Sequence, residues 1–192
     1  MKLCKLLLAV VGATVLLGAL VSTASATHLR SSTQSFRATW TRSEFTGGFV
    51  AARCNLTLEG SLHSATINKT AGSLIGYITR ASVGPCESGS ATVLTATLPW
   101  HVQYASFTGT LPSSIATIVT HVIGAAWRIR EGGFSINCLT TSSAGEPSVG
   151  TYNLTGGSVT SVTLGGTTNC EGINGTLRGT SATNSAQTIT LI

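Results

Sequence analysis

Short runs of β-branched and aromatic residues, separated by glycine turn signals, constrain this chain's fold more than any other sequence feature. Apolar and polar residues alternate over 36–41, 100–104 and 127–130, which is the period-two pattern of a strand with one buried face. No window combines a 3.6-residue apolar repeat with helix caps. Turns are expected at 47–48, 88–89, 132–133, 156–157, 165–166 and 174–175. The expected strands cover 36–41, 50–58, 74–83, 91–98, 100–104, 115–123, 127–130, 134–141, 158–164, 176–180 and 187–192.

Many short strands joined by glycine turns are typical of sandwiches and barrels. The sequence therefore predicts an all-β fold, either a single-domain β-sandwich or a flattened barrel of many short antiparallel strands. A chain near this size buries about 70% of its unfolded surface, which is enough for one core. Because no linker-like run divides it, residues 27–192 are expected to form a single domain.

The N-terminus has the three parts of a secretory signal peptide. Lys2 and Lys5 precede an apolar run at 6–21, and Ala24 and Ala26 frame a small-x-small cleavage site. The apolar run is short for a membrane span and has no basic stop-transfer flank. The sequence thus predicts a signal peptide at residues 1–26, a mature chain without a membrane span, and a secreted or cell-surface location.

Four cysteines remain after this cleavage, and an even number in an exported chain predicts two disulfides. A zinc site would need close-set cysteine pairs, which this chain lacks. Shifting the chain by 84 residues superposes one pair on the other, so residues 27–110 and 111–192 would be pseudo-repeats. Bridges within each half are favoured, although a pseudo-twofold fold would also permit bridges across the halves. The favoured bridges are Cys54–Cys86 and Cys138–Cys170.

Residues 98–112 concentrate the chain's chemical variety between two Leu-Pro pairs. The alternation here places Trp100 and Tyr104 on one face of a strand, and His101 and Gln103 on the other. The favoured interpretation is a core strand with Trp100 mostly buried. The alternative is a recognition surface, because Trp and Tyr combine a large contact area with a polar group. On that alternative, these four residues are the candidate binding residues.

Several functions have no support in the composition. The mature chain has nine Lys and Arg against six Glu, a net charge of +3, without a basic run, so nucleic-acid binding is not expected. Without aspartate there is no Ser-His-Asp triad. Neither the histidine spacing nor any glycine cluster matches a metal or nucleotide motif, so no metal or cofactor is expected. Glu87 and Glu171 each follow a cysteine, a placement that fits solvated turn residues better than a catalytic pair.

Three runs, at 56–64, 74–81 and 98–112, resemble a family of uncharacterised exported bacterial β-rich proteins. The resemblance covers the first half and middle of the mature chain. It implies export and a bacterial host, and it supplies no catalytic residue.

Together these features predict an exported, non-enzymatic β-domain with a binding or structural role at or outside the cell surface. Its expected partner is a cell-surface polysaccharide or protein. One alternative is a small secreted hydrolase whose Glu/His-based site is assembled by folding. The other is an outer-membrane β-barrel. Such a barrel has aromatic residues in two girdles, and this chain has too few aromatic residues to form them.

Overall fold

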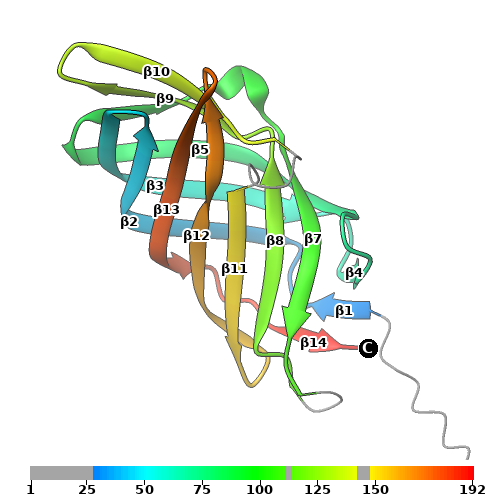
Figure 1. The fold of residues 1–192 in the computed structure, drawn as a ribbon. Helices are drawn as coiled ribbons and strands as arrows, with labels where there is room; N and C mark the ends of the chain where they lie inside the picture. Colours follow the sequence, from blue (N-terminus) through cyan, green and yellow to red (C-terminus); the bar gives the residue numbers. More distant parts are fainter. Residues whose placement is uncertain (1–27, 111–113, 142–147) are drawn as a thin grey trace, which may run out of the picture.

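The computed structural model describes residues 28–110, 114–141 and 148–192, and Figure 1 shows its ribbon. The predicted signal peptide and the second Leu-Pro pair lie outside these residues. The described part contains strands and one short 3₁₀ turn, so the all-β prediction is confirmed. The elements are β1 (His28–Ser31), β2 (Ser35–Gly47), β3 (Val50–Leu62), β4 (Thr66–Asn68), β5 (Leu74–Ser88), β6 (Ser90–Val93), η1 (Thr95–Thr97), β7 (Trp100–Thr108), β8 (Thr117–Ile123), β9 (Ala126–Glu131), β10 (Phe134–Leu139), β11 (Ser148–Thr155), β12 (Ser158–Cys170), β13 (Ile173–Asn184) and β14 (Ile189–Leu191).

Eight strands close into an antiparallel barrel. The order of the paired strands around the barrel is β2, β3, β5, β7, β8, β11, β12 and β13, and each strand pairs with the one after it in this order. The ring is completed where β13 pairs with β2, for example Leu177 with Phe45. Closure leaves none of these eight strands as a free edge. Of the two predicted forms, the pairing therefore favours the barrel over the sandwich.

Two turn assignments from the sequence are wrong. Gly165 and Gly166 lie inside β12, paired with β11, rather than in a turn. The β12–β13 turn is at Glu171 and Gly172, which have φ of 53° and 88°, and not at residues 174–175. Gly175 instead lies where β13 passes close to β2 and the second disulfide, since a Cβ there would strike the carbonyl oxygen of Thr46 and the Cys170 Sγ. A glycine is needed at this position because the two strands approach each other closely. From the sequence alone, such a glycine looks the same as a glycine in a turn.

The segment predicted as a strand at 91–98 is a strand only to Val93. Its remainder forms η1 and leads to Leu98, which precedes Pro99. The strands β1, β4 and β11 were not expected from the sequence. The first two are short, and β11 lacks a strong alternation, so pairing with neighbouring strands is what makes these segments strands.

The barrel interior is filled with apolar side chains. Trp40 is 2% exposed, and its Nε1 donates to the carbonyl oxygen of Val162 at 2.8 Å. Gly179 makes room for this indole, because a Cβ there would lie 2.6 Å from its Cδ1 atom. The two interior cavities measure about 10 and 20 Å³, each large enough for about one water molecule. Neither of these two cavities, which are lined by described residues, therefore has room for an organic ligand.

Both barrel ends are covered. At one end, β6, β9 and β10 extend the sheet, and Trp127 of β9 packs edge-on against Phe45 with ring centroids 5.8 Å apart. At the other end, the three-stranded sheet β14-β1-β4 places Ile67 and Ile189 against the second cavity. Figure 1 shows the β9–β10 hairpin and this small sheet at opposite ends of the molecule. Both covers bury apolar side chains that the ring alone would expose.

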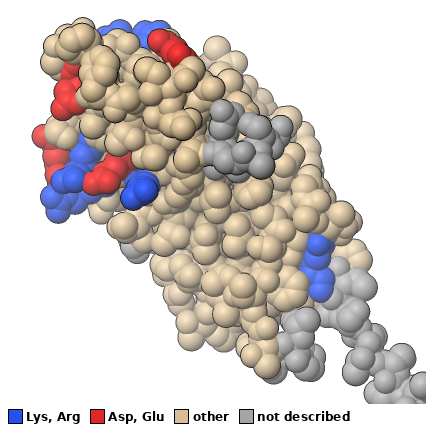
Figure 2. Space-filling model, in the orientation of Figure 1, with Lys and Arg blue, Asp and Glu red and all other residues tan. Residues whose placement is uncertain are grey.

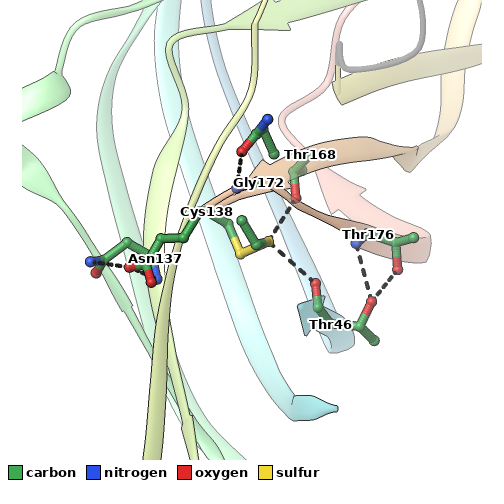
Figure 3. The surroundings of a disulfide bond; sticks show 9 residues. Thr46, Asn137, Cys138, Thr168, Gly172 and Thr176 are labelled. Atoms are coloured by element: carbon green, nitrogen blue, oxygen red, sulfur yellow. Dashed lines mark hydrogen bonds between the residues drawn. A yellow bond between two sulfur atoms is a disulfide. The ribbon is translucent and has the colours of Figure 1, made fainter. Parts of the chain in front are cut away.

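The disulfides are those favoured from the sequence. Cys54–Cys86 joins β3 to β5, and Cys138–Cys170 joins β10 to β12. Around the second bridge, drawn in Figure 3, the Thr168 hydroxyl lies 3.4 Å from the Cys170 Sγ and can donate to it. The second bridge therefore attaches the β9–β10 hairpin to the barrel.

Both predicted halves contribute to the same ring. The first supplies β2, β3, β5 and β7, and the second supplies β8, β11, β12 and β13. A shift of 84 residues maps β5 onto β12 and the start of β3 onto β10, so each disulfide joins corresponding strands. The duplication itself remains a prediction.

Candidate binding site on the outer wall of the barrel

The four candidate residues of β7 divide between the two sides of the wall. Trp100 and Tyr104 are each 3% exposed and point into the barrel, so the core interpretation of Trp100 is confirmed. The indole Nε1 of Trp100 donates to Thr97 Oγ1 at 2.8 Å. Burial raises the pKa of Tyr104 above its ordinary value. Only His101 and Gln103 therefore remain available to a ligand outside the barrel.

His101 belongs to a row of three rings on the outer wall. Tyr77 of β5 lies between His63, at the end of β3, and His101 of β7, with ring centroids 4.7 and 5.3 Å away. The row runs from the residue that follows β3 across β5 to β7, because Tyr77 pairs with His101 on one side and with Ser61, two residues before His63, on the other. We call His63, Tyr77 and His101 the ring row. Gln103 continues this surface and pairs with His121 of β8.

Sequence reasoning missed the contribution of His63 and Tyr77. Successive side chains of a strand point to opposite faces, so the alternation within β5 could have placed Tyr77 on the outer face, opposite to buried Ile78. Nothing in the sequence indicates that this outer position lies beside His101, because the register between β5 and β7 is fixed by folding.

Two glycines permit the close strand approach beneath the ring row. A Cβ at Gly60 would strike the carbonyl oxygen of Tyr77 and lie 2.6 Å from the ring of Phe36. A Cβ at Gly76 would strike the carbonyl oxygen of Ser61. Both positions need a residue without a side chain, since backbone atoms of the neighbouring strand cannot move aside cheaply. The glycines thereby allow the backbones of β3 and β5 to approach closely at Tyr77.

A polar hollow lies one register step from the ring row. Glu59 of β3 receives two guanidinium groups, Arg37 Nε at 3.4 Å and Arg80 Nη1 at 3.2 Å. Glu59 pairs with Arg80, and Ser61, the next outward residue of β3, pairs with Tyr77. We call the hollow of about 290 Å³ at this cluster the arginine hollow; it is lined by Arg37, Thr57, Glu59, Arg80, Ala81, Ser82, Thr95 and Leu98.

Another part of the surface carries no ionic side chains. Within their bounds, β7, β8, β11 and β12 contain no Lys, Arg, Asp or Glu. In Figure 2 this wall faces the viewer without charge, and the charged residues gather mainly toward the end with the β9–β10 hairpin. The arginine hollow on β2, β3 and β5 thus lies beside a wall whose strands contain no Lys, Arg, Asp or Glu.

Exposed apolar rings gather where the hairpin turns meet. Phe49, in the β2–β3 turn, is 75% exposed, and Phe134, at the start of β10, is 59% exposed. Their rings pack edge-to-face with centroids 5.1 Å apart. The side chain of Glu131 joins the same two hairpins, because its Oε2 accepts a hydrogen bond from the Ala51 amide at 2.8 Å. We call Phe49 and Phe134 the tip pair.

The glutamates that the structure describes are engaged with cations or amides rather than with histidines. Glu87 pairs with Arg42 at 2.8 Å, and Glu171 accepts bonds from the backbone and side-chain nitrogens of Asn137 at 3.0 and 2.8 Å. The other three described glutamates contact Arg53, the Arg37–Arg80 pair and the Ala51 amide. Glu87 and Glu171 therefore act in the described structure as polar links at strand ends.

Within residues 28–110, 114–141 and 148–192, no three His, Cys, Asp or Glu side chains are arranged to hold a metal ion. No helix in the described part of the chain is long and apolar enough to cross a membrane. Comparisons with protein-family models, curated proteins and solved structures found no match to this chain.

Proposed function

We propose that this protein is an exported, non-enzymatic binding domain that attaches to a cell-surface polysaccharide through the outer wall of its barrel. The ring row is the observation that carries the proposal. Three rings lie side by side, two on the paired strands β5 and β7 and one on the residue that follows β3, next to a hollow whose lining includes hydroxyl groups. The interior cavities are too small for a ligand, so binding has to use the outer surface.

The chemistry of the ring row suits a sugar polymer. Tyr and His rings offer apolar faces to the C–H groups of a sugar, and their polar atoms can hydrogen-bond its hydroxyls. Gln103 adds an amide with both donors and an acceptor on the same wall. A wall of paired strands holds these groups in fixed positions, which limits the conformational entropy lost on binding.

Export is supported by two independent features. The N-terminal residues have the composition of a signal peptide. All four cysteines of the described chain are paired, and such bridges persist in oxidising compartments outside the cytosol. The resemblance to exported bacterial proteins points the same way, and we propose a secreted or cell-surface location in a bacterium.

Tyr77→Ala tests the proposal directly. The variant and the parent protein are incubated with insoluble cell-wall polysaccharide, and the bound fraction is measured by sedimentation. Loss of the central ring should weaken retention about tenfold, which corresponds to about 1.4 kcal/mol. Phe134→Ala is the matched control, because it removes an exposed ring remote from the ring row. Equal retention of Tyr77→Ala and the parent, with both proteins folded, would refute the proposal.

The two alternatives make different predictions for the same samples. A hydrolase would release soluble sugar fragments during the incubation, although the described glutamates are engaged with arginines and amides. An outer-membrane protein needs an apolar band facing lipid. Here the outward positions of β11 and β12 include Thr151, Asn153 and Thr163, which interrupt the apolar outward positions such as Val149. Both observations favour the binding domain.

The tip pair favours a second candidate function, the docking of a partner protein. Exposed aromatic rings surrounded by charged groups resemble the apolar centre and polar rim of a protein interface. Arg130 and Glu131 supply both charge signs beside Phe134, so the fitting partner offers an apolar pocket with both signs at its rim. Phe49→Ser combined with Phe134→Ser should abolish retention of the protein on intact cells if docking occurs there. The polysaccharide proposal expects that double variant to be retained normally.

A further inference from the structure

We infer that the arginine hollow binds an anionic group of the polymer, a carboxylate or a phosphate, while the ring row contacts its sugar units. This inference rests on the proposed function and names the class of polysaccharide. It assigns a role to Arg37, Arg80 and the hydroxyl groups between them.

The first argument is the charge balance of the cluster. Two arginines share one carboxylate, so the cluster has a net charge of +1. Elsewhere the ion pairs are one to one, as for Arg42 with Glu87 and for Arg53 with Glu44. The extra positive charge of the arginine hollow is therefore available to a second anion.

The second argument is geometric. The side chain of Glu59 is 28% exposed, whereas those of Arg37 and Arg80 are 65% and 81% exposed. The carboxylate is thus at the centre, and it holds two guanidinium groups that face outward. Each guanidinium has five N–H donors in a planar fork, and the ion pair with Glu59 uses few of them. The remaining donors match the paired oxygens of a carboxylate or a phosphate.

The third argument is the lining of the hollow. Ser82 and Thr95 supply hydroxyl groups that can donate to an anion or accept from a sugar hydroxyl, and the Thr57 hydroxyl, which lies 3.0 Å from that of Thr39, can accept a further bond. The volume of about 290 Å³ is at the lower limit of ligand pockets, so it suits one sugar unit or one phosphate rather than a long segment. Because the ring row is one register step away, the two sites can contact neighbouring units of the same chain.

The test compares three immobilised polymers: a neutral glucan, a polyuronate and a poly(glycerol phosphate). Retention at low ionic strength should be about tenfold stronger on at least one anionic polymer than on the glucan, and added salt should reduce it. Preference for the polyuronate identifies a carboxylate ligand, and preference for the other identifies a phosphate. Arg80→Gln should abolish this preference. Its melting temperature should not change, since the side chain is well exposed.

Arg30→Gln is the control, because it removes the same charge from an exposed position on β1 that does not line the arginine hollow. Equal retention of the parent on all three polymers would overturn the inference, as would an Arg80→Gln protein that keeps its preference. In those cases a loss of binding in Tyr77→Ala would still uphold the proposed function. If no polymer is retained and Tyr77→Ala changes nothing, both proposals fail.

Discussion

Replacing Trp100 by alanine should destabilise the barrel strongly. The indole is 3% exposed and packs in the barrel core, where the surrounding structure relaxes only partly when a large side chain is removed. Truncation of a buried Trp typically costs about 3–5 kcal/mol, from lost transfer free energy and the new cavity. For a domain of this size, each kcal/mol lowers the melting temperature by roughly 2–4 °C. The expected decrease for Trp100→Ala is therefore roughly 6–20 °C.

Two companion variants separate the causes of this decrease. Trp100→Phe retains most of the buried volume and loses the hydrogen bond from Nε1 to Thr97, so it should cost about 0.5–1.5 kcal/mol. His101→Ala removes an exposed side chain from the other face of the same strand and should leave the midpoint nearly unchanged. Thermal unfolding followed by circular dichroism gives all three values. A Trp100→Ala protein that melts as the parent does would contradict the assignment of Trp100 to the core.

Three further predictions follow from the same structure. Mass spectrometry of the exported protein should find Thr27 at the N-terminus, and recovery of an intact Met1 would exclude cleavage after Ala26. Non-reducing peptide mapping should recover both disulfides within the halves and no bridge between them. Burial raises the pKa of Tyr152 to about 12. Because this tyrosine ionises at about pH 10 when unfolded, its contribution to stability is complete below pH 10 and is lost as the pH rises toward 12, up to about 2–3 kcal/mol. Tyr152→Phe should reduce the alkaline decrease in unfolding free energy, and an unchanged decrease would show that other groups cause it.

The outer-wall site could be predicted from sequence only in part. Alternation in residues 100–104 correctly placed His101 outside and Trp100 inside, because successive side chains of any strand point to opposite faces. The alternation pattern could not predict that His101 lies close to Tyr77 and His63, or that Arg80 lies close to Arg37. Those residues are far apart in the sequence and meet only through the registers of β2, β3, β5 and β7.

The sequence by itself determined the secondary-structure class, the buried face of each alternating strand, and the even set of cysteines that form two bridges. These properties depend on residues close together in the chain and on the amino-acid composition. The tertiary structure decided that β13 pairs with β2 to close a ring, that Gly165 and Gly166 lie within a strand, and that Phe49 meets Phe134. A period-two pattern specifies which face of a strand is buried but not which strand lies beside it or in what register. That choice depends on how all the strands together fill one core, and the outer-wall site is a consequence of it.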